Sequence, residues 1–306
     1  MGSAVLAYML AALGSWVRIN EAGMSCPDWP LCHGVLVPSM ANGVLWEWSH
    51  RLIALLLGPM ILGVIVTGWR VRERVAGVVP TLAALGAAFI GQVLVGGVTI
   101  HLSNSPASVV AHWGMAMLLL TTLTTLAILS VVAPQAGSRM APGDGSPAAA
   151  LALAAAGAFV TMCIGAFVSS SHAGLACTTF PACNGSLLGS NDLQLAQMLH
   201  RLAAGIFFVL ALFASWSAMR SGSARVGAFA RLGLILTILQ ICLGIANVVW
   251  SLPMVLREAH AANAGLTFLA FVVAAVLAVV DRFEERSVLF ERGLSSGSAV
   301  YAAPRR

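Results

Sequence analysis

The chain has 306 residues, of which 59% are hydrophobic and 9% are charged, and its formal net charge is +5. Soluble domains carry about 25% charged residues, so this composition excludes an ordinary soluble protein and indicates a polytopic membrane protein. The positive charge does not indicate a nucleic-acid partner, because the arginines lie in short segments between apolar runs and form no basic face.

Eight apolar runs are long enough to cross a bilayer as helices, which takes about 20 residues each. In chain order they are 2–19, 44–69, 78–100, 108–133, 148–171, 193–219, 227–250 and 258–281. The sequence therefore predicts an all-α integral membrane protein whose eight transmembrane helices form two tandem four-helix bundles. A segment rich in Pro, Gly and Ser predicts a flexible linker between them, and we expect the end of the charged tail to be disordered. The first half is 1–133 and the linker is 134–147. The second half is 148–281 and the tail is 282–306.

The arginines between the runs gather on one side of the predicted membrane. They are Arg70, Arg72, Arg74, Arg139, Arg220, Arg225, Arg231, Arg282, Arg286, Arg292, Arg305 and Arg306. Cytoplasmic loops are rich in Arg and Lys, so this side and both termini are predicted to be cytoplasmic. The loops at 20–43 and 172–192 are then expected on the outer face.

The two halves repeat each other over their first outward loop. Residues 14–32 read GSWVRINEAGMSCPDWPLC and residues 165–183 read GAFVSSSHAGLACTTFPAC, which align without gaps. With four helices in each half, both halves enter the membrane from the same side, so the repeat is parallel. Further matched positions are Gln92 with Gln240, Gly96 with Gly244, and His112 with His260.

Four histidines lie within the apolar runs, two in each half. His50 and His200 are near the start of the second helix of their halves, and His112 and His260 are near the start of the fourth. Because these helices all begin at the outer face, the two histidines of a half can meet at similar depth. Facing imidazoles in a four-helix bundle suit a haem whose iron is held from both sides. A zinc or copper site is disfavoured because each half lacks further ligands, and a hydrogen-bonded packing role is the alternative for any single histidine. We expect three others to be solvated: His33, His101 and His172.

Each outward loop carries a pair of cysteines. Since the outer compartment of bacteria is oxidising, each pair can form a local disulfide, acting either as a staple or as a redox-active thiol pair. The pairs are Cys26 with Cys32 and Cys177 with Cys183. Two single cysteines inside apolar runs, Cys163 and Cys242, are expected to be small core residues.

A carboxylate distinguishes the first half from the second. Glu47 lies one helical turn before His50, whereas Gln197 lies before the equivalent histidine. An ionisable group at membrane depth costs from about 2.5 to more than 10 kcal/mol, so it usually has a function. A carboxylate beside a haem edge could relay protons or stabilise a cationic intermediate, and an amide cannot. The structural alternative is a salt bridge to Arg51 four residues on or a hydrogen bond to a neighbouring helix.

Arg51 directly follows His50, and Arg201 directly follows His200. Their long side chains could reach outward to haem propionates, although pairing with acidic residues or lipid would give the same pattern.

The motifs CPDWPLCHG, EWSHR, AHWG, LHR and EAHAAN, in this order on eight helices, closely resemble the haem A synthases of the cysteine-containing bacterial type. The resemblance covers residues 5–282. It implies oxidation of the C8 methyl group of haem O to a formyl group by successive hydroxylations, giving haem A for cytochrome oxidase. It also implies a bacterial inner-membrane location and a haem O synthase as the supplier of substrate.

The resemblance further implies a role for each of the predicted site residues. His200 and His260 would ligate a resident haem b, His50 and His112 would hold the substrate haem, and Glu47 would be the key acidic residue. The residues themselves point to the same reactive half, because only that half keeps the carboxylate.

Functions of other classes remain as alternatives. The first is a di-haem membrane electron carrier, such as a quinol-linked cytochrome b, in which Glu47 is incidental. The others are a thiol oxidoreductase acting through the outward cysteines, and a transporter suggested by the repeat. None of them explains both the histidine pairs and the difference between Glu47 and Gln197. The electron donor and assembly into a homo-oligomer stay open.

Overall fold

The computed structural model of the chain describes residues 1–132 and 147–298, with side chains up to residue 282. Within these residues there are eight long helices, each long and apolar enough to cross a membrane, so the chain is a multi-pass membrane protein. They are α1 (Gly2–Ile19), α2 (Val44–Arg70), α3 (Val78–His101), α4 (Pro106–Leu129), α5 (Ala148–Ser170), α6 (Asp192–Arg220), α7 (Ala224–Val249) and α8 (Met254–Ser298), with a short 3-10 helix η1 (Ala173–Leu175) after α5.

The eight predicted helices are confirmed, with ends that move by a few residues. Most of the predicted linker lies outside the described residues, apart from Pro147, which caps the start of α5. The last predicted span, 258–281, corresponds to the candidate span Met254–Arg282, and the helix α8 itself continues to Ser298. The segment after Arg282 is rich in Glu, Arg and Leu, which favour a helix even where it is too polar to be membrane-spanning. The end of the tail, where we predict disorder, lies outside the described residues.

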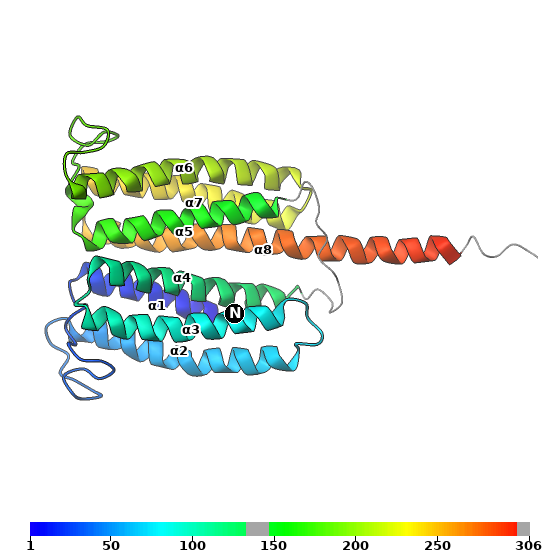
Figure 1. Ribbon diagram of the computed structural model, residues 1–306, viewed down its shortest axis with the longest axis horizontal. Coiled ribbons are helices and arrows are strands. Elements are labelled where there is room, and N and C mark those ends of the chain that lie inside the picture. The colour runs from blue at the N-terminus through cyan, green and yellow to red at the C-terminus, as the bar shows by residue number, and fades with distance from the viewer. Residues whose placement is uncertain (133–146, 299–306) are drawn as a thin grey trace, which may run out of the picture.

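The helices form two bundles that lie side by side along a common direction, α1–α4 in one and α5–α8 in the other (Figure 1). Between the bundles, α4 packs against α5 and α8, and α1 packs against α8. The loops that carry the cysteines, between α1 and α2 and between α5 and α6, lie at the same end of the molecule. The tandem arrangement predicted from the repeat is therefore the one observed.

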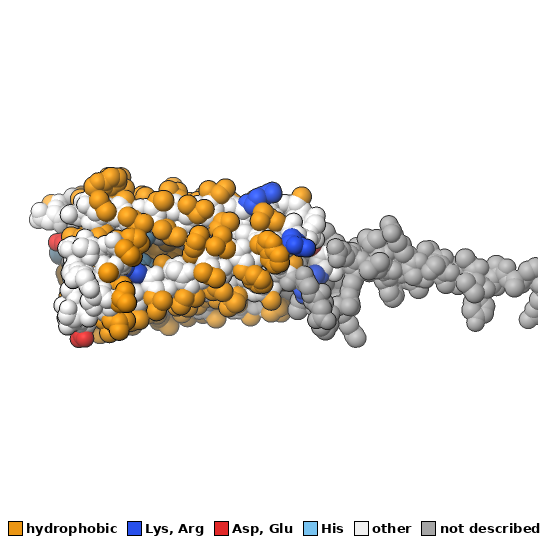
Figure 2. Space-filling view, turned by 90° about the horizontal axis from the view of Figure 1, so that it is seen from above, with side chains coloured by type: hydrophobic (Ala, Val, Ile, Leu, Met, Phe, Trp, Pro, Cys, Tyr) orange, Lys and Arg blue, Asp and Glu red, His pale blue; other side chains and the backbone are white. Residues whose placement is uncertain are grey.

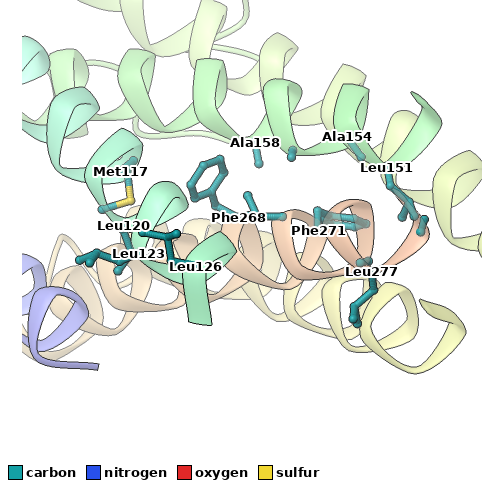
Figure 3. Packing of buried hydrophobic residues seen from close by; sticks show 14 of the residues in the cluster. Met117, Leu120, Leu123, Leu126, Leu151, Ala154, Ala158, Phe268, Phe271 and Leu277 are labelled. Carbon is teal, nitrogen blue, oxygen red and sulfur yellow. The ribbon is translucent and has the colours of Figure 1, made fainter. Parts of the chain in front are cut away.

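The core runs through the contact between the two bundles (Figure 3). Met117 and Leu120 of α4 lie on the same side of this core as Phe268 of α8, and Phe271 lies farther along α8 near Ala154 of α5. Small residues such as Ala154 let the helices approach closely. Small residues matter here because lipid is as apolar as leucine, so packing rather than the hydrophobic effect holds such helices together.

The outer surface between the two ends is apolar. Figure 2 shows hydrophobic side chains covering the sides of the molecule, while most of the visible basic side chains lie toward the end away from the cysteine loops. This is the surface expected of a bundle surrounded by lipid.

We expect Phe271→Ala to destabilise the second bundle by about 2 kcal/mol or more. Phe271 is 0% exposed, lies edge-on to Phe207 with ring centroids 5.9 Å apart, and packs over Gly233. Removing a buried Phe ring usually costs about 3–5 kcal/mol, and the cavity part of that cost remains when the surroundings are lipid. Unfolding in detergent measures the loss. Phe213→Ala, at a ring that is 56% exposed, is the matched control, and equal effects of the two variants would contradict this prediction.

Candidate functional site

The structure brings the intramembrane histidines together in pairs near the loop-bearing end of each bundle. His200 of α6 and His260 of α8 have ring centroids 6.5 Å apart, and their planes are inclined by 74°. His50 of α2 and His112 of α4 lie close enough to interact electrostatically. All four residues are only partly buried. Each bundle therefore presents two imidazoles to a common interior region.

Each imidazole packs against a glycine of a neighbouring helix. A Cβ atom at Gly14 would lie 2.9 Å from Cε1 of His50, and one at Gly165 would lie 2.9 Å from Cε1 of His200. Such a short contact would force the ring to move, so glycine allows helix and ring to approach. The same packing recurs for the histidines of the fourth helices. A Cβ atom at Gly96 would lie 3.1 Å from Cε1 of His112, and one at Gly244 would lie 3.2 Å from Cε1 of His260. Sequence reasoning aligned these glycines in the repeat but gave them no role.

One nitrogen of each imidazole lacks a partner. Among the described residues, the Nδ1 atoms of His50, His112, His200 and His260 are buried without a hydrogen bond. An unpaired buried polar atom costs about 1–3 kcal/mol, so four such atoms at matched positions indicate a site that a bound group completes. No cluster of three or more His, Cys, Asp or Glu side chains suited to hold a metal ion occurs in the described part of the chain. Two imidazoles without further protein ligands are a donor set that would suit a metal already held in a macrocycle.

The separation of His200 and His260 suits such a group. Two imidazoles on opposite sides of one metal ion have centroids about 6 Å apart, given metal–nitrogen bonds of about 2.0–2.1 Å and the size of the rings. The observed 6.5 Å is close to this value. His200 and His260 would therefore fit as the two protein ligands of a haem in the second half.

Glu47 joins the first cysteine loop to α2. Its side chain is 4% exposed, and Oε2 accepts hydrogen bonds from the Cys26 backbone N–H at 2.8 Å and from Ser25 Oγ at 3.0 Å. Oε1 forms a salt bridge with the Arg51 guanidinium at 2.5 Å. The salt bridge considered as an alternative thus exists. It balances the buried charge, and the carboxylate still accepts hydrogen bonds from other donors.

Gln197 holds the second loop in the same way without a charge. Its Oε1 accepts from the Cys177 backbone N–H at 2.7 Å, and its Nε2 donates to the Gly174 carbonyl at 3.0 Å. The loop anchor is therefore conserved in shape between the halves while its charge differs. A glutamine is demonstrably able to occupy this position beside a cysteine loop.

Arg51 and Arg201 bind the cysteine loops. Arg51 donates to the carbonyls of Cys26 at 2.8 Å and of Asp28 and Leu31 at 2.5 Å. Arg201 donates likewise to carbonyls of its own loop, those of Cys177, Thr179, Pro181 and Ala182. The guanidinium groups that we predicted to contact haem propionates thus donate to loop carbonyls. Their contacts with propionates stay a prediction.

The predicted disulfides are both present. Cys26 is bonded to Cys32 and Cys177 to Cys183, and all four residues are at most 2% exposed. Burial keeps these bonds away from bulky thiols, which favours the role of a staple. The core prediction for the single cysteines is wrong for Cys242, which lies on the exposed face of α7, where an apolar thiol can face lipid.

The first cysteine loop carries a partly exposed acid, Asp28. Two backbone N–H groups donate to Asp28, that of Gly34 at 2.8 Å and that of His33 at 2.6 Å. The hydrogen bond from Gly34 contributes most to holding the pKa of the Asp28 carboxyl below its ordinary value. The hydrogen bond from His33 and the charge of Arg51 lower this pKa further. His33, His101 and His172 are exposed, as expected for solvated side chains.

The chain is similar to a known protein family over most of its length. Residues 1–272 match the model of the COX15-CtaA family, described as cytochrome oxidase assembly protein. The chain belongs to this family.

Several haem A synthases are similar over most of the chain. That of Symbiobacterium thermophilum is 33% identical over 233 residues, covering 70% of this chain and 73% of its own. That of Bacillus licheniformis is 29% identical over 263 residues, covering 81% and 84%. That of Rhodospirillum centenum is 29% identical over 309 residues, covering 85% and 82%.

We expect Arg51→Ala to loosen the first cysteine loop alone. The change removes the donor to three loop carbonyls and leaves Glu47 as an unpaired buried carboxylate, a loss that typically costs about 3–5 kcal/mol. Reduction of the Cys26–Cys32 bond by a small thiol should become at least about tenfold faster. Mass spectrometry of alkylated peptides measures both bonds in one sample, with Cys177–Cys183 as the internal control. Equal acceleration at both bonds would show general unfolding instead.

Proposed function

We propose that this protein is a haem A synthase, which oxidises the C8 methyl group of haem O to a formyl group and so provides haem A for cytochrome oxidase. The observation that carries the proposal is the pair of glycine-backed imidazoles in each of two matched bundles, with the buried Glu47 one helical turn before His50 and Gln197 at the matching position before His200. Membership of the cytochrome oxidase assembly family, and relatives that are haem A synthases, support it.

We assign the two haems to different halves. His200 and His260 are the ligands of a resident haem b, for which their centroid separation of 6.5 Å is suitable. His50 and His112 hold haem O, the substrate. When bound, the haem of the second half supplies one-electron transfer. The assignment of substrate to the first half rests on Glu47, since Gln197 cannot take up a proton.

The residues of the first half have three tasks in this reaction. The histidines fix the position of the substrate, and the glycines behind them fix the histidines. Oxidation of a methyl group releases protons, and Glu47 is the buried base that can accept one at a carboxylate oxygen. Arg51 balances the charge of Glu47 and also draws the disulfide loop over the end of the bundle, which limits the entry of water.

We place the cysteine loops on the outer face of the membrane and both termini in the cytoplasm. The support is the excess of arginine in the connections at the other end of the bundles. The substrate is strongly apolar, so we expect it to arrive within the membrane from a haem O synthase.

The decisive test is conversion of haem O by the parent and by Glu47→Gln in membranes. We expect formyl haem from the parent and at least about a hundredfold less from the variant, the usual scale of a general base. Extraction of the haems followed by chromatography and mass measurement gives both results. Because Gln197 already anchors the second loop, the variant should keep its fold and its haem. Equal yields would refute the role of Glu47. Unmodified haem alone from a fully loaded parent would favour the electron carrier.

A second prediction concerns the glycines. Gly165→Ala should displace the His200 ring, because the new Cβ would lie 2.9 Å from it, and should weaken or alter the second-half haem. We expect a changed absorption and electron paramagnetic resonance spectrum for one haem of the two. Gly205→Ala on α6, where a Cβ would meet no described atom within 4 Å, is the control. An unaltered spectrum in Gly165→Ala would show that the imidazole is not held there.

A further inference from the structure

The surroundings of Glu47 differ from those of Gln197 in a consistent way. The hydrogen bonds of the two loops correspond, since His33 Nε2 lies 2.9 Å from the Ser25 carbonyl, and Asn184 Nδ2 donates to the Ala176 carbonyl at 3.2 Å. By the alignment of the loops, Ser25 takes the place of Ala176, and His33 takes that of Asn184. Each exchange gives the first half a side chain that can pass on a proton where the second half has none.

Ser25 occupies the place that connects Glu47 with the outside. Its hydroxyl donates to Glu47 Oε2 at 3.0 Å, and the same residue lines a pocket of about 420 Å³. His33, Ser39 and Asn42, all exposed, also line this pocket. The lining also includes Val35, Pro38, Ala41 and Val44, but the pocket is large enough for water, which its polar side chains can bind. The Ser25 hydroxyl that bonds Glu47 belongs to this lining.

The other donors to Glu47 cannot play this part. The backbone N–H of Cys26 does not exchange its hydrogen as an acid, and the guanidinium of Arg51 stays protonated in proteins. A hydroxyl both donates and accepts, so it can receive a proton on one lone pair while releasing its own. In the described part of the chain, Ser25 is the one hydroxyl with a recorded hydrogen bond to Glu47.

We propose that Ser25 is the proton-transfer residue between Glu47 and the outer medium, with the pocket as the water-filled outlet. The proposal rests on the proposed function, in which Glu47 takes up a proton from the reacting methyl group. In the transfer, the O–H bond of the Glu47 carboxyl breaks and a bond to Ser25 Oγ forms. The Ser25 hydrogen, which points to Glu47 Oε2 while Glu47 is a carboxylate, first turns toward water in the pocket, and it is released there as Oγ accepts the proton from Glu47. Glu47 returns to the carboxylate paired with Arg51, one proton leaves, and no electron is transferred.

The charged and titratable groups around this route are few. Arg51 faces Glu47 from the same helix, and His50 lies one turn farther on. Asp28 and His33 belong to the loop above, where Asp28 accepts the His33 backbone N–H. None of these groups is recorded between Ser25 Oγ and Glu47, so loss of the hydroxyl should interrupt the route directly.

The test follows protonation of Glu47 itself. After a rapid drop in pH, infrared difference spectra of the full-length protein in lipid record the carboxyl band that is absent from Glu47→Gln. We expect Ser25→Ala to slow the appearance of this band at least about tenfold and Ser25→Thr, which keeps a hydroxyl, to leave it near the parental rate. Alanine already occupies the matched position 176, so Ser25→Ala should fold. An intact Cys26–Cys32 disulfide in the variant is the check that it has folded. Ala176→Ser is the control in the second half and should change nothing.

The outcomes separate the two proposals. A parental rate of protonation in Ser25→Ala would overturn the role of Ser25, whatever the activity. An equal slowing in Ser25→Thr would also overturn it, since the hydroxyl would not be the reason. Haem O conversion by the same samples is measured in parallel. If the parent makes no formyl haem while Ser25→Ala still slows the carboxyl band, the proton route stands and the synthase function fails.

Discussion

The contact between a glycine and an imidazole is the steric constraint on which both bundles depend. In a membrane, polar side chains cannot be left among lipid, and helices hold together by close packing. At Gly14 and Gly165 the absence of a side chain lets the neighbouring helix come within contact distance of a ring. Each histidine is thereby fixed from one side and presented to its partner on the other. The rings of His200 and His260 lie 6.5 Å apart, a separation that suits the haem ligation proposed above.

The repeat supplies the same scaffold twice but with different electrostatics. Glu47 and Gln197 receive the same backbone hydrogen bond from a cysteine of the loop, so the shape of the anchor is kept. What differs is the capacity for charge and for proton exchange, which extends to the neighbouring Ser25. This difference is the basis for the proposal that one bundle transfers electrons and the other holds the substrate.

The loops above the histidines are held by charge-assisted hydrogen bonds. In each half a disulfide closes a short ring, and an arginine from the second helix binds several carbonyls of that ring. Such bonds are stronger than neutral ones and are directional. Arg51 also pairs with Glu47, so in the first half the cover of the site and its acidic group form one unit.

The sequence by itself determined the eight helices, the two matched halves, both disulfides and the chemical difference at Glu47, because these depend on length, apolar composition and alignment of the repeat. It did not determine which face of each helix is buried. A transmembrane helix is apolar all round, so its pattern does not separate lipid from protein. Only the tertiary structure decided that Cys242 faces outward, that Arg51 binds loop carbonyls, and that Ser25 meets Glu47. Those contacts join segments far apart in the chain, and the packing of helices brings them together.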